Sequence, residues 1–176
     1  MGIEQAFKPV KLFSGVIYRD GRIYEEIKKR LEATFSPVDI ESGQFDFDFT
    51  TYYNTEMGYP LYRQFISFKK LISPEELPGI KLFTNQVEIE TAVNGKRVVN
   101  LDPGYLSDAN VIIATTKNYY QRVPLTKGIY AHMEYVLKKK KLITLDWTYP
   151  DFKSPQYMNY FETLFSLYRK ALTVKE

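Results

Sequence analysis

The sequence predicts an α+β fold, in which a ferredoxin-like β-α-β-β-α-β core is followed by an added C-terminal β-hairpin and a terminal helix. Two observations predict this class. Strand-like and helix-like apolar periods alternate along the chain, and the 176 residues contain no internal repeat, low-complexity tract or Gly/Ser linker. We therefore expect residues 1–176 to form a single domain.

The first predicted strand covers 11–18 and ends at a turn signal, Asp20-Gly21. Ile23, Ile27 and Leu31 follow at helical spacing, which predicts a helix with one apolar face.

The second predicted strand covers 38–49, where Phe45, Phe47 and Phe49 alternate with polar residues. This period is typical of a strand with one buried face, so we expect helices to cover all three rings. Covered rings cannot stack on bases, and the RNP1 pattern of RNA-binding domains is absent, so RNA binding is the least supported function.

A third strand is predicted over 62–72. Ser73-Pro74-Glu75-Glu76 combines a capping box with a proline at the first helical position, and therefore predicts the start of a second helix. The next strand is expected over 97–101, and Asp102-Pro103-Gly104-Tyr105 is predicted as the turn that closes it.

The remaining chain predicts a buried strand over 110–116 and then a hairpin of strands 129–137 and 142–147. The lysines at 138–141 are expected at the hairpin tip. The last helix begins near Ser154-Pro155 and places one apolar face inward.

Composition excludes several classes of site. The chain has no cysteine and one histidine, which excludes thiolate nucleophiles and histidine-rich zinc sites and fits a cytoplasmic location. The net charge of +3 is a weak excess, no apolar run is long enough to span a membrane, and no polybasic arm suggests a nucleic-acid partner. Abundant lysine, glutamate and tyrosine are compatible with a heat-adapted host.

Cations and hydroxyls gather after the strand at 110–116. Thr116, Lys117, Arg122 and Lys127 provide the donors that phosphate or carboxylate groups need, although a solvated loop rim would have the same composition. We predict an anion site here. Since Arg122 is placed in a loop, its removal is expected to change folding stability by no more than about 0.5 kcal/mol.

Two carboxylates are candidate catalytic residues. Asp102 at a strand end and Glu88 on the second helix could act as acid and base, or could hold a Mg²⁺ ion as the cofactor. Asn85 shares a helix face with Glu88 and is a candidate ligand contact. The alternatives are that Asp102 bonds turn amides and that Asn85 and Glu88 form a surface pair.

The segment before the last helix supplies further candidates. Tyr149 could stack on a ligand ring and Asp151 could fix a hydroxyl or a metal, whereas Trp147 is expected to pack. His132 is predicted to be a partly exposed strand residue. No P-loop, Rossmann or hydrolase-elbow motif is present.

Four segments together resemble an uncharacterised prokaryotic family, a domain of unknown function of about this length: GKRVVNLDPGYL, ATTKNYYQR, GIYAHMEYVL and DWTYPDFKSPQY. Members are sometimes labelled GTP-binding proteins, but no motif here carries that label. The family pattern often has a histidine where Gln121 stands and an acidic residue where His132 stands, which weakens any scheme with a histidine base before Arg122. The resemblance implies recurring polar positions at Asn85, Glu88, Asp102, Lys117, Arg122, Tyr149 and Asp151.

Two functions from different classes remain open. The first is binding of a small anionic ligand, a nucleotide or a phosphorylated metabolite, in a cleft beside the sheet, with phosphoryl or nucleotidyl transfer as the reaction class if the protein is an enzyme. The second is a noncatalytic interaction or regulatory module that acts as a homo-oligomer. Fold alone does not distinguish them.

Overall fold

A computed structural model describes residues 2–173 and shows a mixed α/β architecture. The strands are β1 Val10–Tyr18, β2 Val38–Glu41, β3 Phe45–Asp46, β4 Tyr62–Ile72, β5 Val99–Leu106, β6 Asn110–Thr115, β7 Val123–Pro124, β8 Tyr130–Lys138 and β9 Lys141–Thr144. The helices are α1 Gly21–Thr34, α2 Asn54–Met57, α3 Leu77–Glu90 and α4 Pro155–Thr173, with short 3₁₀ turns at Pro74–Glu76 and Asp151–Lys153.

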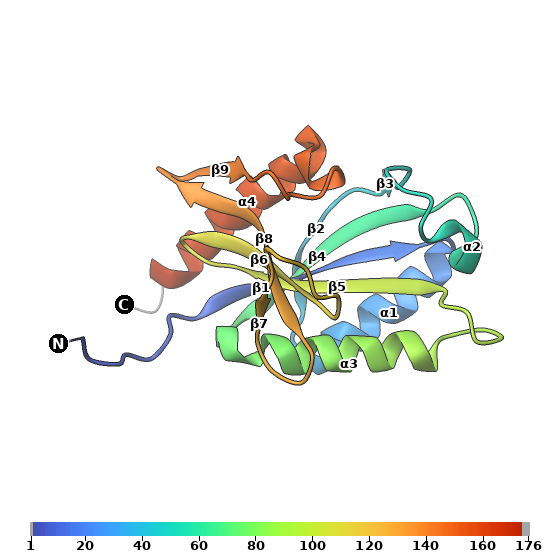
Figure 1. Cartoon of the computed structure of the whole chain (residues 1–176), viewed down its shortest axis with the longest axis horizontal. Coiled ribbons are helices and arrows are strands. Elements are labelled where there is room, and N and C mark those ends of the chain that lie inside the picture. The colour runs from blue at the N-terminus through green and yellow to red at the C-terminus, as the bar shows by residue number, and fades with distance from the viewer. Residues whose placement is uncertain (1, 174–176) are drawn as a thin grey trace.

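The nine strands form one sheet in the order β2-β4-β1-β5-β6-β8-β7, with β3 paired to β4 and β9 paired to β8. Each of these pairings is antiparallel. Helices α1 and α3 lie along one face of the sheet, and α4 covers part of the other (Figure 1). The sheet therefore separates two hydrophobic layers.

The layer beneath α1 and α3 follows from the periodicity of the sequence. Tyr24, Ile27 and Leu31 of α1 are buried against alternate residues of β1, such as Val16. The capping box at Ser73–Glu76 is formed as predicted, and α3 continues directly from it. Burial of one face of each helix supplies the main stabilisation of this layer.

The layer beneath α4 is rich in aromatic rings. Tyr157, Phe161 and Tyr168 are fully buried, and Phe161 packs edge-on against Phe13 of β1 with ring centroids 5.0 Å apart. The predicted apolar face of the last helix is confirmed. Each such ring pair adds about 0.5 to 1.5 kcal/mol beyond the burial of its area.

The strand predicted over 38–49 is interrupted, so that only β2 and β3 form. Phe45 is half-buried against Tyr157, Phe47 is buried, but Phe49 is 43% exposed. The prediction that all three rings are buried therefore holds for Phe47, is met only in part by Phe45, and is wrong for Phe49. The backbone leaves the sheet after Asp46, and strand alternation no longer decides which way the following side chains point.

The turn predicted at 102–105 is also wrong, because these residues lie inside β5. Gly104 is needed for close packing rather than for a turn: a Cβ there would lie 2.3 Å from the carbonyl oxygen of Ile112 and 2.6 Å from the Phe13 ring. Pro103 lies next to the point where pairing with β6 begins, at Gly104 and Ile113. A proline, which has no N–H to donate, is tolerated where a strand lacks a neighbour.

The predicted hairpin is confirmed by β8 and β9. Lys139 and Lys140 form its tip with φ values of 49° and 64°, the left-handed conformation that two-residue hairpin turns require.

Candidate functional site

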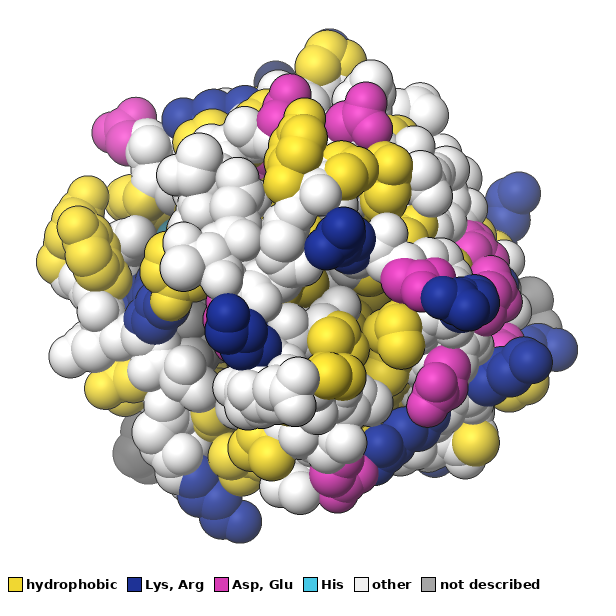
Figure 2. Space-filling model, turned by 90° about the vertical axis from the view of Figure 1, so that its right-hand side faces the viewer, with side chains coloured by type: hydrophobic (Ala, Val, Ile, Leu, Met, Phe, Trp, Pro, Cys, Tyr) yellow, Lys and Arg dark blue, Asp and Glu magenta, His cyan; other side chains and the backbone are white. Residues whose placement is uncertain are grey.

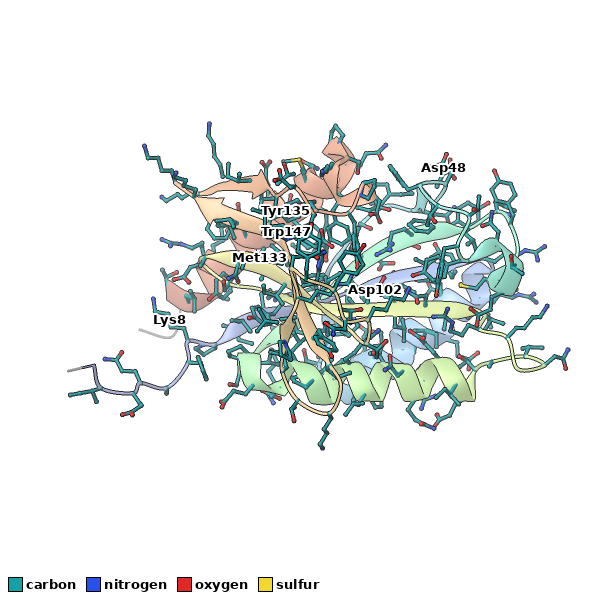
Figure 3. The ribbon with its side chains drawn as sticks, viewed as in Figure 1. Lys8, Asp48, Asp102, Met133, Tyr135 and Trp147 are labelled. Atoms are coloured by element: carbon teal, nitrogen blue, oxygen red, sulfur yellow. The ribbon has the colours of Figure 1, made fainter. Side chains whose placement is uncertain are left out.

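A cavity of about 780 Å³ opens where β5 and β6 separate. The two strands pair only from Gly104–Ile113 to Leu106–Val111, so the first half of β5 has β1 as its partner but not β6. Asp102 lies in this half of β5, which does not pair with β6, near the middle of the molecule (Figure 3). The cavity also receives residues from β4, α3, and the loops that follow β3, β6 and β9.

The cavity brings together eight of the nine residues predicted as site residues. They come from four separate parts of the chain: Asn85, Glu88, Asp102, Thr116, Lys117, Arg122, Tyr149 and Asp151. Lys127 is the exception, because it lies in the turn before β8 with a φ of 52° and does not line the cavity. The predicted convergence of Lys117 and Arg122 with Asp102 on one pocket is observed.

Arg63 of β4 forms the floor of the cavity and is not among the residues predicted from the sequence. Its side chain is only 4% exposed, and its Nη2 lies 3.3 Å from an oxygen of Asp102 and 3.6 Å from one of Asp151. Its Nε and Nη1 have no hydrogen-bond acceptor among the described residues. The strand period could have revealed it, since Arg63 alternates with the buried Phe65 and faces the same side of the sheet.

Aromatic rings and a glycine hold the Arg63 guanidinium in place. Its carbon lies 5.0 Å, 5.5 Å and 5.9 Å from the ring centres of Phe47, Phe65 and Phe152, within the range of cation–π contact. A Cβ on Gly15 of β1 would lie 2.6 Å from Nη1. Arg63 therefore crosses β1 above Gly15 to reach Asp102 on β5.

Burial raises the pKa of two carboxyl groups that line the cavity. Desolvation raises the pKa of Asp151 above its ordinary value, while the charge of Arg63 opposes the shift. Desolvation likewise raises the pKa of Glu88, whose Oε1 accepts a hydrogen bond of 2.6 Å from the Leu101 N–H. The Arg97 Nη1 lies 3.5 Å from Glu88. Among the described residues, no group of three His, Cys, Asp or Glu side chains is arranged to hold a metal ion.

These raised pKa values predict the pH dependence of stability. A carboxyl group whose pKa is higher in the folded state stabilises the fold fully below its ordinary value, and that contribution is lost as the pH rises through the raised pKa. We expect the free energy of unfolding to increase as the pH falls from neutrality toward 4.5, the ordinary value of glutamate. Urea titrations at several pH values measure it.

Glu88→Gln is the matched variant for this experiment, because glutamine keeps an oxygen for the Leu101 N–H and does not titrate. Its stability should rise less on acidification than that of the wild type. The pKa of Glu56 is lowered by its hydrogen bonds to Arg97, so Glu56 stabilises the fold above pH 4.5, its ordinary pKa. This contribution is lost only as the pH falls below that value. An identical pH slope in the variant would show that Glu88 contributes nothing to it.

Arg122 organises the loop after β6. Its Nη1 donates to the Lys117 carbonyl at 2.7 Å, its Nη2 donates to the Tyr149 hydroxyl at 2.6 Å, and its Nε donates to His132 Nδ1 at 3.4 Å. The Lys117 ammonium lies 4.1 Å from the ring centre of Tyr52. Within the described residues, neither cation has a carboxylate within salt-bridge distance.

His132 is fully buried, so the prediction of a partly exposed histidine is wrong. Its ring stacks on Tyr149 with centroids 4.7 Å apart, and its Nε2 lies 3.3 Å from Oε1 of Glu134. Glu134 is also fully buried, and it accepts the Tyr149 N–H at 3.0 Å. Desolvation raises the pKa of Glu134. The His132–Glu134 pair thus supports Arg122 and Tyr149 from behind the cavity.

Trp147 is half-buried and does not line the cavity. Its indole N–H donates to the carbonyl of Met133 at 3.0 Å, and Figure 3 shows the two residues beside each other near Tyr135. The tryptophan therefore fixes the chain that leads from β9 to Tyr149 and Asp151.

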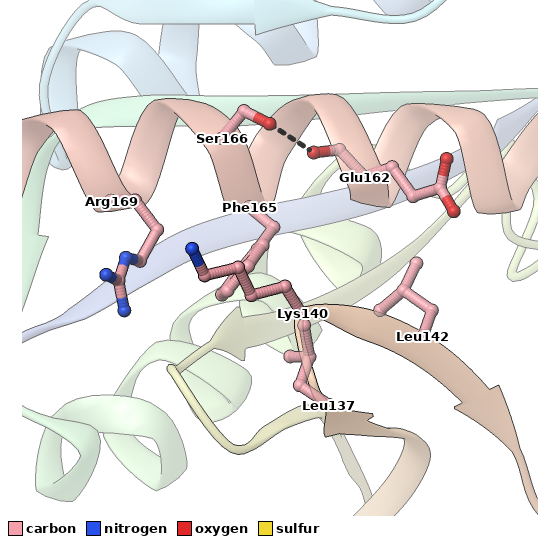
Figure 4. Close-up of a pocket in the computed structure, with 7 residues that line it drawn as sticks. All are labelled: Leu137, Lys140, Leu142, Glu162, Phe165, Ser166 and Arg169. Atoms are coloured by element: carbon pink, nitrogen blue, oxygen red, sulfur yellow. Dashed lines mark hydrogen bonds between the residues drawn. The ribbon is translucent and has the colours of Figure 1, made fainter.

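A second cavity of about 540 Å³ lies between the β8–β9 hairpin and α4 (Figure 4). Leu137, Leu142 and Phe165 form its apolar wall, and the exposed Lys140 and Arg169 stand at its edge. None of the predicted site residues lines it. The cavity beside β5 is therefore the candidate functional site.

Comparison with known proteins identifies a family. A family model described as a domain of unknown function (DUF4416) matches residues 8–168, which is most of the chain. No curated protein and no solved structure matches the chain. Among the described residues, no helix has both the length and the apolar character needed to cross a membrane.

Proposed function

The chain belongs to the DUF4416 family of domains of unknown function, and we propose that it binds a small anionic ligand, a nucleotide or a phosphorylated metabolite, in the cavity between β5 and β6. One observation carries this proposal. Lys117 and Arg122 line the cavity without a carboxylate partner among the described residues. Phosphate groups bind best to such cations, because arginine offers two parallel donors and lysine a compact charge.

The other arginines of the cavity are already neutralised. Arg63 lies between Asp102 and Asp151, and Arg97 pairs with Glu56 through hydrogen bonds of 2.7 Å and 2.9 Å. A third cation of the cavity, Lys81, has no carboxylate within salt-bridge distance among the described residues either, but it is buried and donates to the Leu101 carbonyl at 2.7 Å. An anion is therefore attracted to the more accessible Lys117 and Arg122 rather than to every basic residue in the cavity. The Thr116 hydroxyl stands next to Lys117 and supplies a further donor.

The size and lining of the cavity suit a ligand with a ring. Its volume of about 780 Å³ lies within the range of small-molecule sites. Phe49 and Tyr52, which are 43% and 58% exposed, line it together with Tyr149. Exposed aromatic faces stack on planar or ring-shaped groups.

Phosphoryl or nucleotidyl transfer is the reaction class that we propose if the protein is an enzyme. Asp102 and Glu88 would act as acid and base, or would hold a Mg²⁺ ion together with the ligand's phosphates, since Mg²⁺ often takes only one or two protein carboxylates. Hydrolysis of ATP and GTP with Mg²⁺ and with a chelator tests this step. Activity that survives in Asp102→Asn would exclude the role given to Asp102.

We also infer that the first hundred residues form a ferredoxin-like unit in the cytoplasm. The antiparallel order β2-β4-β1-β5, with α1 and α3 on one face, supports the ferredoxin-like assignment. The absence of cysteine supports a reducing compartment. The face shown in Figure 2 intersperses basic side chains with acidic and hydrophobic ones and therefore offers no continuous basic track to a nucleic acid.

Replacing Lys117 with alanine tests the proposed site most directly. Lys117 is exposed and its ammonium donates no hydrogen bond among the described residues, so folding stability should change by less than about 0.5 kcal/mol. Affinity for the tightest ligand in a thermal-shift screen of adenine and guanine nucleotides and inorganic phosphate should fall about tenfold. Calorimetric titration measures the fall.

Lys127→Asn is the control, because Lys127 lies outside the cavity and asparagine tolerates its left-handed φ of 52°. It should bind like the wild type. Equal losses in both variants would mean that the anion is attracted only by overall charge, and no binding in the screen would contradict the proposed function.

The alternative function, a noncatalytic module acting as a homo-oligomer, is supported by apolar side chains around the edge strand β7. Tyr119, Tyr120, Val123 and Leu125 are 59%, 84%, 61% and 43% exposed. Edge strands with exposed apolar residues pair readily with another chain. Light scattering after gel filtration tests this alternative: a dimer that dissociates in Val123→Lys, together with an empty ligand screen, would favour it.

A further inference from the structure

We propose that the cavity recognises a phosphorylated sugar, free or as part of a nucleotide, and that Asp102 and Asn85 bind its hydroxyl groups. This inference rests on the proposed function, because it assumes that Lys117 and Arg122 hold the phosphate. It specifies the chemical groups of the ligand other than the phosphate. The evidence is that several polar side chains of the cavity have no hydrogen-bond partner among the described residues.

Asp102 is an acceptor without a donor. Its carboxylate is 22% exposed and lies 3.3 Å from Arg63, but it accepts no hydrogen bond from the described residues. Asn85 of α3 lines the same cavity, is half-buried, and likewise makes no side-chain hydrogen bond among the described residues. A second phosphate would be repelled by Asp102 and Asp151. The part of the ligand that contacts Asp102 and Asn85 must therefore be neutral or cationic.

Arg63 beneath them is a donor without enough acceptors. It is almost fully buried at the floor of the cavity, and two of its nitrogens have no acceptor among the described residues. Burying a donor without an acceptor costs about 1 to 3 kcal/mol. The Nε and Nη1 atoms are themselves shut off from the cavity, so a ligand oxygen is favoured beside Nη2, the nitrogen that lies next to Asp102.

A hydroxyl group suits both Asp102, which lacks a donor, and Arg63, which lacks acceptors, because a hydroxyl donates one hydrogen bond and accepts two. It can donate to Asp102 while its oxygen faces the guanidinium of Arg63. An ammonium group could donate to Asp102 but could not accept, and it would place a second buried cation beside Arg63. The chemistry therefore favours a polyhydroxylated ligand over an amine.

The aromatic wall fits the same ligand. Phe49 and Tyr52 expose their rings at the cavity, and Lys117 lies against the Tyr52 ring at 4.1 Å. A sugar or a base that lies on these rings has its phosphate close to Lys117. Stacking, anion binding and hydroxyl binding are thus available within one cavity.

Calorimetric titration of the full chain with methyl phosphate and with ribose 5-phosphate tests the proposal, since both probes carry the anion and only one carries hydroxyls. We expect ribose 5-phosphate to bind at least about tenfold more tightly. Asp102→Asn should remove most of this preference, whereas methyl phosphate, which offers no hydroxyl group of a sugar, should bind no more weakly than to the wild type because a repelling charge has been removed. Asn85→Ala, which replaces a helical residue by the best helix former, should reduce the preference as well and remains informative if Asp102→Asn does not fold.

The matched control is Asp146→Asn, because Asp146 is exposed and lies outside the cavity. It should keep the full preference. Adenosine monophosphate separates the two sources of the sugar: tighter binding than ribose 5-phosphate assigns a nucleotide, and weaker or equal binding assigns a free sugar phosphate, either of which supports the proposal.

Equal affinity of the wild type for methyl phosphate and ribose 5-phosphate would overturn hydroxyl recognition and leave the anion site standing. A preference that survives in both Asp102→Asn and Asn85→Ala would overturn the roles of these two residues. No binding of either phosphate or of any nucleotide would overturn the proposed function and this inference with it.

Discussion

Replacing Arg63 with methionine should lower the free energy of unfolding by about 3 to 5 kcal/mol, the usual cost of removing one partner from a buried ion pair. The substitution fills a similar volume but leaves Asp102 and the buried Asp151 without their cation. Urea denaturation followed by circular dichroism measures the loss. We expect it to shrink on acidification, because protonation of Asp151 removes the uncompensated charge.

Two controls identify the cause. Arg22→Met removes an arginine that also pairs with an aspartate but is 91% exposed, and it should cost far less stability than Arg63→Met because solvent screens the pair. Arg63→Met combined with Asp102→Asn and Asp151→Asn should recover most of the lost stability, since no buried charge then remains unpaired. If the triple variant is as unstable as Arg63→Met, the loss comes from packing against Phe47, Phe65 and Phe152 rather than from the charges.

Replacing Arg122 with alanine should weaken both binding and folding. Loss of a charge-assisted contact to a phosphate costs about 1.5 to 3 kcal/mol of binding. The substitution also removes the donors to Tyr149 and to the fully buried His132, and leaving a buried acceptor unpaired costs about 1 to 3 kcal/mol of stability. Calorimetric titration with the ligand and urea denaturation measure the two effects separately.

Arg122→Lys is the informative comparison, because lysine keeps the charge and loses the planar fork. It should restore little of the stability, since one ammonium cannot reach the Lys117 carbonyl, Tyr149 and His132 together. Unchanged stability in Arg122→Ala would show that these hydrogen bonds contribute nothing, as the sequence-based placement in a solvated loop implied.

Local periodicity predicted the long helices α1, α3 and α4 and most of the strands, but not the short helix α2. Ile27 and Leu31 of α1, and Phe161 and Tyr168 of α4, are buried as their spacing indicated, because one face of each helix packs on the sheet. Asp102-Pro103-Gly104 was wrongly predicted as a turn, because a glycine can indicate either a turn or a position where two strands pack closely. Only the register with β6 reveals that Gly104 permits close packing there, and register is a nonlocal property.

The residues at the edge of the candidate site were predictable from the sequence, whereas the partners of Arg63 and His132 beneath it were not. Lys117, Arg122 and Asp102 lie in polar clusters at the ends of apolar runs, which is the usual place for binding residues. Arg63 and His132 lie inside strands, where the sequence gives no sign of which partners meet them. The pairings of Arg63 with Asp151 and of His132 with Glu134 and Tyr149 depend on how the last segments fold over the sheet.

Gly15 bears on how related sequences should be compared. It does not line the cavity, yet it is the bare position on β1 over which the Arg63 guanidinium reaches Asp102. A relative that keeps both charged residues but carries a side chain at the position of Gly15 would have to shift its arginine, which changes the geometry of the ion pair. Any grouping of the family by ligand preference should therefore weigh this glycine with the residues that touch the ligand.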